Sequence, residues 1–110
     1  MIHKMTLSQP YYDMVKNNMK TVEIRILDEK RKLLNIKDKI EFYNEDKSKK
    51  FIRIIKNLII HDNFELAIRK ATLRDTMPNC KTVNEANNIY LNIYKDKIKG
   101  NKILAIYLKS

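Results

Sequence analysis

Residues 17–26 read Asn17-Asn18-Met19-Lys20-Thr21-Val22-Glu23-Ile24-Arg25-Ile26, and the periodicity of the sequence changes within this stretch. Apolar residues recur at helical spacing up to it, and apolar and polar residues then alternate strictly. Because successive side chains of a strand point to opposite faces, one face is predicted to carry Val22, Ile24 and Ile26. Thr21, Glu23 and Arg25 share the other face, and Lys20 comes just before them. A strand that serves only the fold does not need this polar set, so we expect a ligand site here.

The residues before this stretch predict a strand over residues 1–7 and then a short helix. Ser8 is a good N-cap for that helix, and Pro10 suits its first turn. Asn18 is expected to end the helix, because asparagine tolerates the left-handed backbone conformation found at helix ends. A strand over residues 21–27 follows.

The middle of the chain predicts two strands joined by a polar turn. The expected elements are a short helix or turn within residues 28–34, a strand over 39–44, a hairpin turn at 45–48 and a long strand over 50–60. Ile54 and Ile55 break the alternation of the long strand. Either a β-bulge or full burial would explain that break.

Two capped helices are predicted in the last third of the chain. Asp62 lies three residues before Glu65, and Thr82 lies three residues before Glu85. This is the spacing of a capping box, in which the first side chain accepts a hydrogen bond from the backbone of the second residue. Pro78 separates the two helices.

The final strand is expected over residues 103–108, which are apolar enough for a central position in the sheet. We therefore predict a single α+β domain over residues 1–110, in which five or six short strands curl into a β-barrel with peripheral helices.

The composition is that of a folded but strongly basic chain. Lys and Arg number 23 and Asp and Glu number 13, so the net charge at pH 7 is +10. Such an excess indicates a polyanionic partner, and nucleic acid is the first candidate. An A+T-rich genome, whose codons favour Lys, Asn and Ile, would produce the same bias without any function. The composition leaves both explanations open.

A reducing compartment fits the single cysteine, Cys80, which has no partner for an internal disulfide. No apolar run approaches the roughly 18 residues that a membrane span needs, and no secretory signal is visible. We expect a cytoplasmic protein without a membrane partner, or a nuclear one if the source is eukaryotic or viral.

Neither a metal site nor a cofactor is expected. His3 and His61 lie far apart in the sequence and form no zinc pattern with Cys80. Gly100 is the only glycine, and one glycine cannot make a glycine-rich phosphate loop.

Four segments together resemble a known family. They are Leu7-Ser8-Gln9-Pro10-Tyr11-Tyr12, Lys20-Thr21-Val22-Glu23-Ile24-Arg25, Asp28-Glu29-Lys30-Arg31 and Ile36-Lys37-Asp38-Lys39-Ile40-Glu41-Phe42. In this order they look like a small ASCH domain, and the resemblance covers essentially the whole chain. It implies a PUA-like fold, which is a β-barrel with flanking helices and a cleft used on RNA.

The chain departs from the family pattern at two turns. The family usually has glycine before the Lys-Thr segment, where this chain has Asn18-Met19, and Gly-Asp before the third strand, where it has Lys37-Asp38. Asparagine can replace glycine at a positive φ angle at a small cost in conformational free energy, whereas the cost for lysine is larger.

The resemblance also implies enzyme activities. Some members of the family hydrolyse N4-acetylcytidine with a Lys, a Thr and a Glu, and a ribonuclease activity is described for others. The family lysine corresponds to Lys20, but the nucleophilic threonine would fall at Glu23. Residues 62–93 offer no clear counterpart of the catalytic glutamate. The expected function is therefore an RNA- or nucleotide-binding domain with a basic cleft, and the alternative is a hydrolase of modified cytidine nucleosides or of RNA.

The polar set on the strand over residues 21–27 supports three interpretations. In a binding cleft, Arg25 would grip a phosphate or a base edge, Glu23 would accept from a base amine and Lys20 would attract phosphate. In a catalytic site, Glu23 would act as a general base and Thr21 as an activated nucleophile. In a purely structural role, Glu23 and Arg25 would form a solvated ion pair worth about 0–1 kcal/mol.

The predicted partner is RNA or another single-stranded nucleic acid, or a nucleoside. The residues predicted to bind it are Lys20, Thr21, Glu23, Arg25, Lys30, Arg31 and Tyr43, and those with a predicted catalytic role are Lys20, Glu23 and Thr21. Tyr43 and Tyr94 are expected to be exposed enough to stack on bases. Core packing is expected for Tyr11, Tyr90 and Tyr107.

Overall fold

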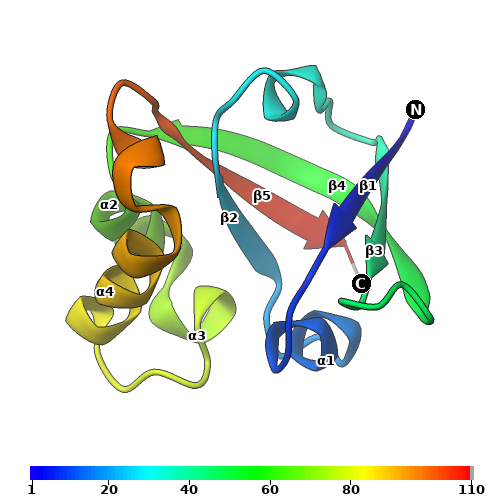
Figure 1. Cartoon of the computed structure of the whole chain (residues 1–110), viewed down its shortest axis with the longest axis horizontal. Helices are drawn as coiled ribbons and strands as arrows, with labels where there is room; N and C mark the ends of the chain where they lie inside the picture. The colour runs from blue at the N-terminus through cyan, green and yellow to red at the C-terminus, as the bar shows by residue number, and fades with distance from the viewer. Residues whose placement is uncertain (110) are drawn as a thin grey trace.

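A curled sheet organises the computed structural model, which describes residues 1–109 (Figure 1). Its strands are β1 (Ile2–Thr6), β2 (Val22–Ile26), β3 (Lys39–Tyr43), β4 (Lys50–His61) and β5 (Ile103–Lys109). The helices are α1 (Tyr11–Lys16), α2 (Phe64–Ala71), α3 (Leu73–Thr76) and α4 (Val83–Tyr94), with the 3₁₀ turns η1 (Arg31–Leu33) and η2 (Lys95–Ile98). The predicted class, an α+β fold with a barrel-like sheet and peripheral helices, is confirmed.

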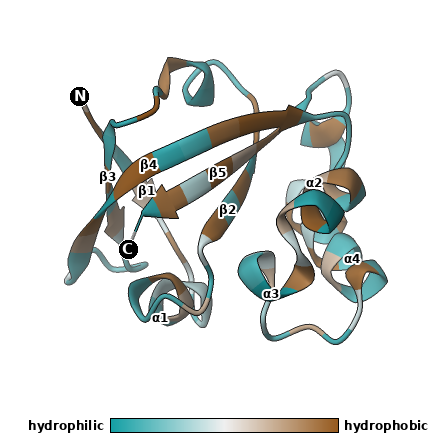
Figure 2. Ribbon diagram, turned by 180° about the vertical axis from the view of Figure 1, so that it is seen from behind, coloured by the Kyte–Doolittle hydropathy of each residue, from teal (hydrophilic) through white to brown (hydrophobic). Residues whose placement is uncertain are grey.

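The strands follow the order β1-β3-β4-β5-β2 across the sheet. β1 pairs with β3 in parallel, and the other pairs are antiparallel. β4 has a bulge-like register shift between Ile55 and Asn57, directly after the break in alternation noted at Ile54 and Ile55. Full burial does not explain that break, because Ile54 is exposed. Figure 2 shows a hydrophilic stretch near the middle of β4, between two apolar stretches.

β5 is buried on both of its faces. Ile103 and Ala105 belong to one core, which lies between β2, β5 and the helices α2 and α4. Leu104 and Ile106 belong to a second core, which lies inside the curl against β1, β3, β4 and α1. A strand covered on both sides has no solvated face, which explains its continuous apolar run. The predicted central position of this strand is confirmed.

The curl brings the two outer strands, β1 and β2, to opposite sides of one gap. Val22, Ile24 and Ile26 point from β2 into the first core, as the alternation predicts. Arg25 crosses the gap, and its Nη2 donates a hydrogen bond to the carbonyl of Thr6 on β1 at 3.1 Å. We call this gap the seam of the sheet.

Two predicted caps are wrong by position. Helix α1 begins at Tyr11, and its N-cap is Pro10, with no hydrogen bond to a capping side chain. Ser8 takes part through its backbone only, since its carbonyl accepts a hydrogen bond from the Tyr12 N–H at 3.0 Å. Helix α2 is capped by Asn63, which accepts from the Leu66 N–H at 2.9 Å. Asp62 instead forms an ion pair with Lys102, because the helix starts one residue later than expected.

Other local predictions hold. Thr82 caps α4 by accepting from the Glu85 N–H at 3.1 Å. The two positions where the family has glycine both take positive φ angles, 61° at Asn18 and 78° at Lys37. The short helix α3, between Thr72 and Met77, was not foreseen. No helix among the described residues is long and apolar enough to cross a membrane.

Candidate functional site

A pocket opens at the seam between β1 and β2. We call it the seam pocket, and its lining comes from three parts of the chain: Thr6, Leu7, Ser8 and Tyr11; Lys20, Glu23, Ile24 and Arg25; and Met77, Tyr90, Ile93 and Tyr94. Its volume is about 180 Å³. A cavity of roughly 150 Å³ accepts benzene, so the seam pocket has room for a single flat ring.

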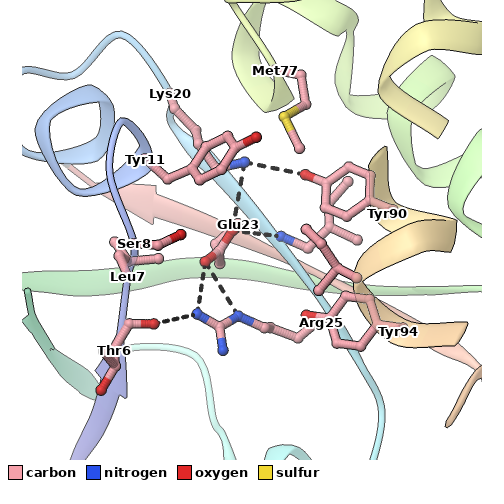
Figure 3. A pocket seen from close by; sticks show the side chains of 12 residues that line it. Thr6, Leu7, Ser8, Tyr11, Lys20, Glu23, Arg25, Met77, Tyr90 and Tyr94 are labelled. Carbon is pink, nitrogen blue, oxygen red and sulfur yellow. Dashed lines mark hydrogen bonds and ion pairs between the residues drawn. The ribbon is translucent and has the colours of Figure 1, made fainter. Parts of the chain in front are cut away.

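Three charged side chains from one segment of the chain meet at the back of the pocket (Figure 3). Glu23 lies between Lys20 and Arg25. Its Oε2 accepts from Nη2 of Arg25 at 3.0 Å and from Nε at 3.2 Å, and its Oε1 lies 3.5 Å from Lys20 Nζ. Lys20 is 2% exposed and Glu23 is 5% exposed. The interpretation of Glu23 and Arg25 as a solvated surface pair is therefore wrong, because this cluster is buried.

The hydrogen bonds of Lys20 are fully used inside the protein. Its ammonium has three donors, and they face the carbonyl of Thr76, the hydroxyl of Tyr90 at 3.2 Å and the carboxylate of Glu23. Thr76 and Tyr90 stand on α3 and α4, so Lys20 ties the helical layer to the sheet. Among the described residues, the ammonium has no donor left for a ligand in this arrangement.

The carboxylate of Glu23 is similarly occupied. Besides Arg25 and Lys20, it accepts from the Ile24 N–H at 3.2 Å. Four contacts account for the acceptor sites of an ionised carboxylate. Glu23 in this state orients Arg25 rather than receiving a base amine.

Burial and charge work against each other in this cluster. Burial lowers the pKa of Lys20, although the neighbouring Glu23 opposes it. Burial alone would raise the pKa of Glu23, but Arg25 and Lys20 outweigh it and the pKa lies below its ordinary value. Burial also opposes the charge of Arg25, yet Glu23 raises the pKa of that guanidinium. Glu23 is thus ionised and Arg25 is charged at neutral pH.

Hydroxyl groups form the rest of the polar lining. Ser8 and Tyr11 stand at the start of α1, and Tyr90 and Tyr94 stand one turn apart on α4. Burial raises the pKa of Tyr90 well above its ordinary value and the pKa of Tyr94 to about 12. These hydroxyls stay protonated at neutral pH, and each can donate as well as accept.

The tyrosine predictions are mixed. Tyr90 is buried as expected, and Tyr11 packs against the first core as expected, although it is only partly buried and also lines the pocket. Tyr94 was expected to be exposed, yet it is half-buried and stacks on Phe64 with ring centres 5.3 Å apart. The i, i+4 spacing of Tyr90 and Tyr94 was the sequence signal that both side chains lie on the same face of a helix. No local sequence signal indicated that Ser8 lines a pocket.

The other predicted site residues separate into two places. Thr21 is not brought to the seam pocket; it lines a groove on another side of the molecule, together with Asp75 and Tyr107. Its backbone N–H donates a hydrogen bond to the Asp75 carbonyl, and its carbonyl accepts one from the Leu108 N–H. Lys30, Arg31 and Tyr43 line a second pocket that shares Thr6 and Arg25 with the seam pocket. The binding and catalytic roles of these residues stay predictions.

Within residues 1–109, no group of three or more His, Cys, Asp or Glu side chains is placed to hold a metal ion. Cys80 is a buried free thiol. Burial raises its pKa, which makes it a poor nucleophile at neutral pH.

Replacing Lys20 with methionine is expected to cost only about 1–3 kcal/mol of unfolding free energy, the penalty for leaving the Thr76 carbonyl and Tyr90 hydroxyl without their donor. The remaining Glu23–Arg25 pair is neutral, so no charge is left uncompensated. The folded pKa of Lys20 lies below its unfolded value of 10.5. Wild-type stability relative to Lys20→Met should therefore rise with pH from the folded pKa toward 10.5. Urea unfolding between neutral and alkaline pH measures both effects; a difference that shrinks with pH would contradict the assignment.

No protein-family model matches the sequence, and no curated protein is similar to it in sequence. Solved structures are similar in fold. The crystal structure of hypothetical protein PH0355 has a TM-score of 0.88 and 24% identity, over 99% of this chain and 98% of that one. Protein PF0455 from Pyrococcus furiosus has a TM-score of 0.77 and 23% identity, over 99% and 96%.

An ASCH protein is among these similar structures. A mutant of ZmASCH from Zymomonas mobilis has a TM-score of 0.71 and 14% identity, over 99% of this chain and 68% of that one. At such identities the likeness concerns the fold alone. The chain has an ASCH-like, PUA-like fold, as the sequence resemblance implied.

Proposed function

We propose that this protein binds RNA or a nucleotide and takes one base into the seam pocket. The observation that carries the proposal is a ring-sized pocket walled by tyrosines, with a partly buried Arg25, held by Glu23, at its edge. Aromatic rings stack on any base, and neighbouring hydroxyls of both hydrogen-bonding types suit base edges. The net charge of +10 adds attraction to any polyanion.

The locked geometry of Arg25 favours binding. Two hydrogen bonds to Glu23 and one to Thr6 hold its guanidinium in place before a ligand arrives. A preorganised donor loses little conformational entropy on binding. The buried cluster thus positions a binding group, although contacts within the described part of the chain already occupy Lys20 and Glu23.

Tyr11→Ala tests the pocket, because Tyr11 lines it and, among the described residues, makes no side-chain hydrogen bond to Lys20, Glu23 or Arg25. Loss of one stacking ring is worth about 1–3 kcal/mol, so we expect the affinity for a short single-stranded RNA to fall about tenfold or more. Tyr107→Ala is the matched control, because Tyr107 is also half-buried but lines the groove with Thr21. Fluorescence anisotropy at low and physiological salt measures both variants.

The salt dependence of RNA affinity distinguishes binding in the seam pocket from nonspecific attraction by the net charge. Neither tyrosine carries charge, so the slope of affinity against salt should match the wild type. Equal affinity of the wild type and Tyr11→Ala, with binding abolished by salt in both, would mean that the net charge acts alone. The proposal would then fail.

Hydrolysis of modified cytidine nucleosides or of RNA is the second candidate. Ser8 and Tyr11 bring hydroxyls to a pocket that also holds a lysine of lowered pKa, and perturbed groups in a pocket are a mark of catalytic sites. Turnover of N4-acetylcytidine and of RNA, followed by mass spectrometry, tests it. Activity that Ser8→Ala or Tyr11→Phe removes while binding persists would support the candidate; no turnover by the wild type would exclude it for these substrates.

A further inference from the structure

Five cationic side chains converge on the pocket next to the seam pocket. We call it the basic pocket; its volume is about 400 Å³. The cations come from four segments of the chain, and they are Lys4, Arg25, Lys30, Arg31 and Lys47. Met5, Thr6 and Tyr43 complete the lining, so no carboxylate of residues 1–109 lines this pocket.

Most of this positive charge has no local counter-ion. Within residues 1–109, no carboxylate oxygen lies within 4.0 Å of the ammonium groups of Lys4, Lys30 or Lys47. Two acids lie nearby. Asp28 pairs with Arg31, itself a cation of this pocket, at 3.4 Å. Glu41, opposite Lys4 in the β1–β3 register, pairs with Lys50 at 3.3 Å, and Lys50 and Lys4 both lower its pKa.

Both arginines of the basic pocket have donors to spare. Nη1 of Arg25 has no acceptor among the described residues, and Figure 3 shows it outside the contacts with Glu23 and Thr6. Nε of Arg31 is buried and has no hydrogen-bond partner in the described part of the chain. A small turn of that guanidinium toward an anionic oxygen would therefore gain a hydrogen bond without breaking one at Nε.

We propose that the basic pocket is a phosphate subsite, which binds a phosphate group of the nucleotide whose base occupies the seam pocket. This inference rests on the proposed function. Arg25 lines both pockets, so it lies between the base and the phosphate. Planar guanidinium groups with parallel donors match phosphate oxygens, and lysines add point charges around them.

The test compares ligands that differ only by a phosphate. The four ribonucleosides, their 3′- and 5′-monophosphates and the corresponding dinucleotides are titrated by calorimetry at about 0.15 M salt. We expect at least one monophosphate to bind about tenfold or more tightly than its nucleoside, the gain of charge-assisted hydrogen bonds. Equal affinities of nucleoside and monophosphate would overturn the subsite but leave the base pocket standing. Dinucleotides that match the monophosphate identify an internal phosphodiester as the bound group, and weaker ones identify a terminal phosphate.

A matched pair of double variants locates the gain. Lys30→Gln with Arg31→Gln should abolish the advantage of the monophosphate, so that it binds no more tightly than its nucleoside. Arg69→Gln with Lys70→Gln removes the same charge from exposed positions on α2 and should keep the advantage. An equal loss in both double variants would assign the effect to net charge and overturn the subsite.

Inorganic phosphate tests the subsite even if no nucleoside binds. Phosphate, compared with chloride at equal ionic strength, should shift the backbone amide NMR signals of Lys30, Arg31 and Lys47 more than those of Arg69 and Lys70. Equal shifts in the two groups would overturn the proposal. RNA anisotropy with Tyr11→Ala decides the proposed function separately.

Discussion

Replacing Glu23 with alanine is expected to lower the free energy of unfolding by about 3–5 kcal/mol, the cost of leaving buried charge without its partner. Lys20 and Arg25 would then stand near each other with no carboxylate between them. Their side chains are 1% and 16% exposed, so water can compensate only part of the loss. Urea unfolding at neutral pH measures the change.

The matched control for this substitution is Glu65→Ala. Glu65 pairs with Arg69 at i, i+4 on α2, with both side chains more than half exposed, and such a pair contributes about 0.5 kcal/mol or less. A loss below about 1 kcal/mol in Glu23→Ala would mean that the buried cluster does not act as an ion network.

The pH dependence has a defined sign. The folded pKa of Glu23 lies below its ordinary value of 4.5, so its stabilisation is fully present above that value. It is lost as the pH falls through the folded pKa. The stability difference between the wild type and Glu23→Ala should therefore narrow in acid.

Replacing Phe64 with alanine is expected to cost about 3–5 kcal/mol, as for other buried aromatic residues cut back to alanine. Phe64 is 1% exposed and lies in the first core. Its ring stacks on Tyr90 with centres 4.9 Å apart and planes 3° apart, and on Tyr94 at 5.3 Å and 18°. Thermal or urea unfolding measures the loss of stability.

The same substitution should also weaken RNA binding. Phe64 backs both tyrosines of α4 that wall the seam pocket, so its removal lets them shift. Phe51→Ala is the control, because Phe51 packs against the second core, stacked on Phe42 and edge-to-face with Tyr12, away from this wall. Equal loss of RNA affinity in both variants, measured where both are folded, would show that the wall of the pocket does not depend on Phe64.

Period-2 alternation was enough to locate the strands to within a residue or two. It also placed Val22, Ile24 and Ile26 on the core face, because that pattern directly reflects which side of a strand is buried. The continuous apolar run of the last strand identified its central place for the same reason. Caps were less certain, since Asp62 and Asn63 are neighbours and both residue types cap helices well.

The nature of the candidate site could be read only in part. Lys20, Glu23 and Arg25 lie within six positions of each other, so the sequence alone placed them together. That they are buried depends on Thr76 and Tyr90, which lie 56 and 70 positions beyond Lys20. Thr21, next to Lys20 in the chain, faces another groove.

Residue type and local spacing thus determined the strands and the central place of β5 in the sheet. They also determined the polar cluster of Lys20, Glu23 and Arg25 at the start of β2. The two pockets that share Arg25 exist only because the sheet curls and brings β1 opposite β2. Ser8, Tyr11 and Tyr90 line the seam pocket, and Arg31 lines the basic pocket. The physical reason is that periodicity reports which side of an element is buried. It carries no information on which distant segment covers that side. That segment decides whether a charged side chain is solvated, held by hydrogen bonds within the protein or free to bind a ligand.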